Sequence, residues 1–106
     1  MIHSCLVEAL GLPVDKRFQR FISLDSGDFI YPANRSERYM VLEVSMFEGR
    51  SVESKKRFVR LLFERCSALG VAENDLEITI FETPKHNWGI RGVPGDELDL
   101  SYKVEV

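Results

Sequence analysis

The chain is poor in the features that mark several large classes of protein. It has only two cysteines, Cys5 and Cys66, with no C-x-x-C pair and no disulfide framework, which fits a reducing cytoplasm. It has no apolar run of about eighteen residues and no basic segment followed by an apolar one at its start, so neither a membrane span nor a signal peptide is predicted. With 14 basic and 17 acidic residues, no overall field favours nucleic acid or an anionic membrane as a partner.

Motifs for the common cofactor and metal chemistries are missing as well. No Gly-rich phosphate loop, nucleophile elbow or paired-carboxylate motif occurs in the sequence. His3, His86 and the two cysteines are the only metal-type donors apart from carboxylates, and no zinc spacing connects them. We therefore expect no metal and no cofactor.

What is present is a pattern of alternating strands and helices within one expected domain, residues 1–106. Apolar residues recur at helical spacing between Val52 and Leu69, Ser51 can cap the start of this helix, and Gly70 can close it. Strand-like runs lie on both sides, at 38–47 and 76–81. A helix that joins two strands at this length usually returns the chain parallel to its start, so residues 36–83 predict a right-handed βαβ unit.

The front of the chain, residues 1–33, repeats part of this pattern. The run "IHSCLVEALG" has helical spacing up to Gly11, and "RFQRFISL" at 17–24 has the composition of a strand. The letters "ALG" occur at Ala9 and again at Ala68, each time before a strand-like run. If the halves are duplicates, Met1 corresponds to about Arg60, inside the second helix, and the first unit lacks its opening strand. Either that strand precedes Met1, which we favour because a half-helix is a poor start for a domain, or another chain fills its place.

The last segment, residues 84–106, is dense in turn residues and is expected to be a loop and a strand. Asp96 is expected to cap a brief helical turn. The run "SYKVEV" alternates like a terminal strand, with Tyr102, Val104 and Val106 on one side.

The order of these motifs resembles the tautomerase superfamily, the group of 4-oxalocrotonate tautomerase, macrophage migration inhibitory factor and malonate semialdehyde decarboxylase. The resemblance rests on "FEGRSVESKKRFVRLLFERC", "ALGVAENDLEITIFE", "RSERYMVLEV" and "ETPKHNWGIRG". It implies an α+β fold of two pseudo-duplicated βαβ units, with a four-stranded mixed sheet and two helices on one face, here without the first strand. It also implies a homotrimer whose sheets face inward, and an enol–keto tautomerase or related lyase activity on small 2-keto or enol carboxylic acids.

In that family the general acid or base is an amino-terminal proline, which this chain lacks. Its prolines are internal imides that cannot act as bases: Pro13, Pro32, Pro84 and Pro94. No catalytic residue is therefore assigned, and the chain as written is expected to be inactive. The alternative is a non-catalytic trimeric assembly or binding module on the same fold.

The resemblance implies a substrate-binding role for three residues. Arg50, in the "GRS" turn, matches a substrate-binding arginine, Trp88 matches a pocket tryptophan, and Arg91 follows it closely. A planar guanidinium suits a carboxylate, so these residues predict a small carboxylate ligand. The alternatives are a turn-capping role for Arg50 and loop anchoring for Trp88. His86, in "PKHNW", is a possible general base, although an exposed loop histidine is the commoner explanation.

Three positions depart from the pattern of the family, two of them from the pattern of its decarboxylase members. Glu48 stands where they carry a second arginine, and Lys16 stands where they carry an aspartate. Ile90 stands where an aromatic residue is frequent. The decarboxylation machinery of those members is therefore expected to be incomplete here.

Overall fold

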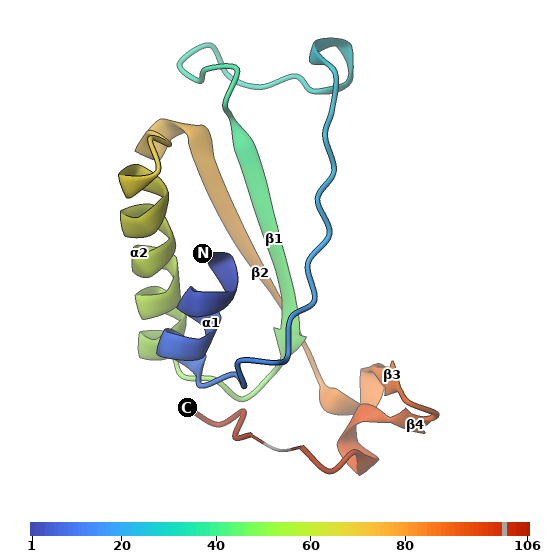
Figure 1. The fold of residues 1–106 in the computed structure, drawn as a ribbon. Coiled ribbons are helices and arrows are strands. Elements are labelled where there is room, and N and C mark those ends of the chain that lie inside the picture. Colours follow the sequence, from blue (N-terminus) through green and yellow to red (C-terminus); the bar gives the residue numbers. More distant parts are fainter. Residues whose placement is uncertain (101) are drawn as a thin grey trace.

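The computed structural model describes residues 1–100 and 102–106, and it has one long helix and one short helix over a parallel pair of strands (Figure 1). The helices are α1 (Ile2–Leu10) and α2 (Val52–Ala68). The strands are β1 (Met40–Phe47), β2 (Leu76–Thr83), β3 (Gly89–Ile90) and β4 (Val93–Pro94), and short 3-10 turns lie at Ser26–Asp28, Glu73–Asp75, Lys85–Asn87 and Gly95–Glu97.

The predicted βαβ unit is present. Strands β1 and β2 pair in parallel, with Met40 opposite Leu76 at one end and Phe47 opposite Thr83 at the other. The side chain of Ser51 caps α2 by accepting a hydrogen bond from the Ser54 amide at 3.1 Å, which satisfies one of the free donors at the helix start. The chain leaves the helix through Gly70, at a φ of 87°.

The predicted first helix is present as well, and Gly11 ends it. Gly11 has a φ of 71°, a left-handed conformation that costs glycine little, and its amide donates to the Val7 carbonyl at 3.1 Å. The Leu12 amide donates to the Leu6 carbonyl, so two carbonyls of the last turn are satisfied. The two "ALG" motifs thus mark two helix ends.

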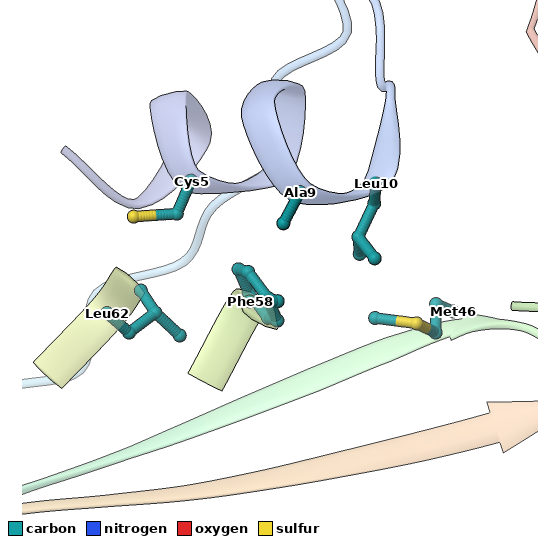
Figure 2. Packing of buried hydrophobic residues seen from close by; sticks show 6 residues of the cluster. All are labelled: Cys5, Ala9, Leu10, Met46, Phe58 and Leu62. Carbon is teal, nitrogen blue, oxygen red and sulfur yellow. The ribbon is translucent and has the colours of Figure 1, made fainter. Parts of the chain in front are cut away.

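The core lies between the two helices and one face of the strands. Figure 2 shows side chains of α1 directed toward those of α2 and β1, and the buried cluster comprises Cys5, Ala9, Leu10, Met46, Phe58 and Leu62. Leu42, Val44, Ile78 and Ile80 on the strands pack against this cluster. Both helices therefore cover the same face of the sheet, as the α+β expectation required.

The predicted strand at 17–24 is wrong. Among the described residues its backbone makes no hydrogen bond, and Phe18 and Phe21 are 90% and 79% exposed. A strand needs a neighbouring strand to satisfy its amides and carbonyls, and β1 pairs only with β2 in the described part of this chain. The composition is that of a strand, but none of the described residues pairs with it.

The expected four-stranded mixed sheet is also not found in the described part of the chain. Strands β1 and β2 form one two-stranded sheet, and β3 and β4 form a separate antiparallel hairpin. The two strands of the hairpin are joined by Arg91 and Gly92, which both have positive φ, so the turn closes the hairpin on itself.

The expected terminal strand is wrong for 102–106, and Ser101 lies outside the described residues. The carbonyl of Val106 accepts hydrogen bonds from the hydroxyls of Ser51 and Ser54, at 2.9 and 2.7 Å, and Val104 is fully buried. The tail therefore packs at the start of α2. Asp96 does not cap the turn at Gly95–Glu97: Pro94 precedes that turn and Asp96 is its second residue.

None of the helices in the described ranges is long and apolar enough to span a membrane.

Candidate carboxylate site

Arg50 lies where β1 ends and α2 begins, and its side chain is buried, with 7% exposed. Its Nη1 donates to the carbonyl of Phe47 at 3.2 Å. Its Nε is buried and has no hydrogen-bond partner among the described residues. The preceding Gly49 has a φ of 128°, and a Cβ there would lie 3.1 Å from Val104, so the tail closes tightly over this turn. Arg50 is therefore fixed in place by its surroundings, and one of its hydrogen-bond donors has no partner among the described residues.

Burial and the neighbouring side chains shift the pKa of Arg50 in opposite directions. Burial lowers the pKa of Arg50, and the nearby Tyr102, Glu82 and Glu105 raise it. Glu82 is already paired with Lys55, at 2.6 Å between Nζ and Oε1, and Glu105 approaches Lys85 at 3.7 Å. Because each carboxylate has its own cation, neither neutralises Arg50 alone.

Trp88 contacts the ring of Phe47, the residue whose carbonyl accepts the hydrogen bond from Arg50. The rings of Phe47 and Trp88 meet edge to face, with centroids 5.0 Å apart and planes at 79°. The amide of Gly95 donates to the Trp88 carbonyl at 2.6 Å, and a Cβ on Gly95 would lie 3.2 Å from the Phe47 ring. Phe47, a buried residue of β1, therefore links Arg50 to the hairpin that carries Trp88.

Arg91 and His86 lie on the same C-terminal segment but are not brought into contact with Arg50. Arg91 is exposed at the tip of the hairpin, with a φ of 52°, and His86 is exposed in the turn Lys85–Asn87. In the part of the chain that the structure describes, neither side chain forms a hydrogen bond or an ion pair. Ile90 is half-buried in β3.

Two positions depart from the decarboxylase pattern. Glu48 lies directly after β1, and Lys16 lies after α1. The amide of Glu48 donates to the Thr83 carbonyl at 2.9 Å, which extends the β1–β2 ladder by one bond, and its side chain is exposed. Lys16 is half-buried after α1, and its amide donates to Pro13. No group of three or more His, Cys, Asp or Glu side chains among the described residues is placed to hold a metal ion.

Sequence reasoning missed the acidic and phenolic neighbours of Arg50. Glu82 lies opposite Met46 in the parallel register, so the pairing of β1 with β2 brings it to the same end as Arg50. That signal was available, since parallel strands end at one edge. Tyr102 reaches Arg50 through the path of the tail, for which the sequence gives no comparable signal.

Comparison with known proteins identifies the family. Residues 16–91 match the family described as "Tautomerase enzyme". A probable tautomerase, YrdN of Bacillus subtilis (strain 168), is 34% identical over an alignment of 95 positions that covers 81% of this chain and 70% of that protein. The chain belongs to the tautomerase superfamily. The family that the sequence motifs suggested is thereby confirmed.

Other members of the superfamily match shorter or more distant parts. A 2-hydroxymuconate tautomerase of Comamonas testosteroni is 40% identical over 60 residues, covering 53% of this chain and 90% of that protein. The crystal structure of a malonate semialdehyde decarboxylase inhibited by 3-bromopropiolate superposes with a TM-score of 0.74 at 33% identity, over 83% of this chain and 71% of that one. A second malonate semialdehyde decarboxylase, at 24% identity and a TM-score of 0.74, shows the same fold. The α+β tautomerase fold is therefore also confirmed.

Proposed function

We propose that the chain carries a binding site for a small 2-keto or enol carboxylic acid, of the kind used for enol–keto tautomerisation or a related lyase reaction. Arg50 binds the carboxylate and Trp88 forms an apolar wall of the site. The observation that carries the proposal is the Nε of Arg50, which is buried without a partner in the described residues of a tautomerase-superfamily chain.

A ligand carboxylate suits this arginine for two physical reasons. An unpartnered buried donor costs free energy, and an anion that accepts from it removes that cost. A charge-assisted bond to a carboxylate is also stronger than the single bond that Arg50 makes to a neutral carbonyl. Because Glu82 and Glu105 face Lys55 and Lys85, they compete weakly for the guanidinium.

We assign Arg91 as a second cation for the ligand, and His86 is the candidate general base to test if the chain converts the acid. Both are exposed on the segment that carries Trp88, so both side chains are free to turn toward a bound acid. Histidine is the side chain most often used for proton transfer in enzymes. The four prolines of the chain are internal imides and have no basic nitrogen. These 106 residues alone are therefore expected to bind the acid and to show negligible tautomerisation.

The second candidate is a non-catalytic assembly or binding module on the same fold, and an exposed face of the sheet favours it. Val41 and Phe81, on the face away from the helices, are 43% and 50% exposed, which a homotrimer with inward-facing sheets would cover. Cys5 and Cys66 are free and buried, which suits a reducing compartment, and we assign the protein to the cytoplasm.

Titration calorimetry with phenylpyruvate tests the binding proposal. The wild-type chain is expected to bind, Arg50→Ala to lose binding, and Arg50→Lys to retain part of it because the charge remains. Arg60→Ala, an exposed arginine on α2, is the matched control and should bind like the wild type. Equal binding by Arg50→Ala and wild type would refute the site.

Ultraviolet monitoring of phenylpyruvate or a small 2-hydroxydienoate separates the two candidates. Binding with no tautomerisation fits a chain that holds the acid but lacks the base. Tautomerisation that disappears in His86→Ala identifies His86 as the base. A chain that neither binds nor converts the acid leaves the assembly module as the function.

A further inference from the structure

An open groove of about 390 Å³ lies between α2 and β2, which run side by side in Figure 1, and it shares no residue with the site at Arg50 and Trp88. Three aliphatic and three cationic side chains line it: Val52, Val59, Ile80, Lys55, Lys56 and Arg60. Its volume falls in the range of small-molecule sites, roughly 300 to 1,000 Å³. We propose that this groove binds a monocarboxylate with an aliphatic chain, and that its occupation weakens ligand binding at Arg50. The second part rests on the function proposed above for Arg50.

The cationic side of the groove lacks a negative partner. Lys56 and Arg60 lie four residues apart on α2, so they are neighbours on one helix face, where like charges repel. Both are exposed, and within the described ranges neither forms an ion pair and no acidic side chain lines the groove. A carboxylate between them would relieve the repulsion and accept charge-assisted hydrogen bonds from both.

The apolar side of the groove selects the body of the ligand. Val52 is 56% exposed, and Val59 and Ile80 are half-buried. A chain that packs along these three side chains removes their remaining apolar surface from water, which is favourable. All three are aliphatic, whereas the Arg50 site is bounded by the aromatic rings of Phe47 and Trp88. An aliphatic acid therefore suits the groove.

Lys55 connects the groove to Arg50. It lines the groove, and its Nζ lies 2.6 Å from Oε1 of Glu82. Glu82 follows Ile80 by two residues on β2, so both side chains lie on the face that the helices cover, and Glu82 is at the end of the sheet where Arg50 lies. The pKa of Arg50 is raised by Glu82, as a nearby carboxylate requires.

This ion pair makes the two sites oppose each other. A carboxylate in the groove competes with Glu82 for Lys55. Once released, Glu82 can pair with the Nε of Arg50, which has no partner among the described residues. Glu82 then occupies the donor that a ligand carboxylate would use, so the groove ligand and the Arg50 ligand weaken each other by the same factor.

Titration calorimetry with decanoate, below the concentration at which it forms micelles, tests the groove. We expect wild type and Arg50→Ala to bind decanoate equally, and the double variant Lys56→Ala/Arg60→Ala to bind it about tenfold more weakly or less, because two charged donors are lost. The control is Arg17→Ala/Arg20→Ala, which removes the same charge from exposed residues outside the groove and should bind like the wild type. Acetate should bind far more weakly than decanoate, because it covers none of the aliphatic surface.

Titration of phenylpyruvate with and without decanoate, at a concentration that saturates the wild-type groove, tests the coupling. Decanoate should weaken phenylpyruvate binding to the wild type about fivefold or more. Lys56→Ala/Arg60→Ala should bind phenylpyruvate like the wild type and should no longer respond to decanoate. Glu82→Gln should bind decanoate more tightly, because Lys55 loses its partner, and should show no coupling.

Four results would overturn the proposal. Decanoate binding that is unchanged in Lys56→Ala/Arg60→Ala, or equally weakened in the control, refutes the groove. Loss of decanoate binding in Arg50→Ala places the acid at Arg50 and refutes the groove as well. Equal binding of acetate refutes the role of the aliphatic side chains. Competition that persists in Lys56→Ala/Arg60→Ala refutes the coupling.

Failure of the function proposed for Arg50 has a different signature. In that case the wild type binds no phenylpyruvate with or without decanoate, and the coupling fails with it. The decanoate titrations of Arg50→Ala and Lys56→Ala/Arg60→Ala still decide whether the groove binds an aliphatic acid.

Discussion

Gly95 is the residue whose replacement should most specifically disturb the candidate site. A Cβ at this position would overlap the backbone carbonyl oxygen of Lys85 and would lie 3.2 Å from the ring of Phe47. The first contact is with backbone, so no side-chain rotation relieves it. The hairpin that carries Trp88 must therefore move away from Phe47 in Gly95→Ala.

The cost should resemble that of overpacking a core. Forcing a methyl group into a filled site destabilises by about 1 to 3 kcal/mol, and part of the strain should appear as displacement of the hairpin. The 2.6 Å bond from the Gly95 amide to the Trp88 carbonyl and the edge-to-face contact with Phe47 should both weaken. Helix α2 and its core contacts lie elsewhere and should be preserved.

Trp88 is the only tryptophan of the chain, so its fluorescence reports on this hairpin directly. Gly95→Ala should shift the emission to longer wavelength, lower the thermal midpoint and weaken phenylpyruvate binding, with a far-ultraviolet circular dichroism spectrum like that of the wild type. Gly89→Ala is the matched control, because a Cβ there meets nothing within 4 Å. The reasoning is refuted if the two alanine variants have the same emission and the same thermal midpoint.

Three further predictions concern the core, the hairpin turn and a buried carboxylate. Phe58→Ala should lower the free energy of unfolding by about 3 to 5 kcal/mol in urea titrations, because the fully buried ring leaves a cavity; a loss no larger than that of an exposed-site variant would contradict this. Arg91→Asn should raise the thermal midpoint, because Arg91 has a φ of 52° in a two-residue turn that favours asparagine; a lower midpoint would contradict it. The hydrogen bonds from Ser36 lower the pKa of Asp75, so the stability that Asp75 contributes is present above its ordinary pKa of about 4 and is lost as the pH falls below it. Asp75→Asn should flatten this part of the profile of thermal midpoint against pH, and an unchanged profile would count against the assignment.

The parts of the fold that sequence predicted well are those whose cause is local. The helix of α2 is specified by its own apolar spacing, by the Ser51 cap and by Gly70 after its end, and all three lie within one continuous stretch. Its length also dictates a parallel return, so the pairing of β1 with β2 followed from the same stretch.

The residues of the candidate site were predictable from local motifs, but the contact that joins them was not. Arg50 and Trp88 were identified from short motifs, and their motifs placed them at the end of a strand and in a loop. The contact that joins them, through Phe47, depends on the path of the chain between Thr83 and Trp88. That path is set by turns and by the close approach of Gly95 to Lys85, neither of which has a periodic signal in the sequence.

The failures at 17–24 and 102–106 have one physical cause. Apolar alternation tells whether a segment can be a strand, but the free energy of a strand comes from its neighbours, which supply both the hydrogen bonds and the covering surface. Val104 is fully buried without a ladder, because the tail finds its hydrogen bonds at Ser51 and Ser54. Phe18 finds neither a ladder nor cover within the described chain, so the same alternation leaves it exposed. Strand composition therefore predicts which segments are able to pair, and it does not predict whether the described residues supply a neighbouring strand.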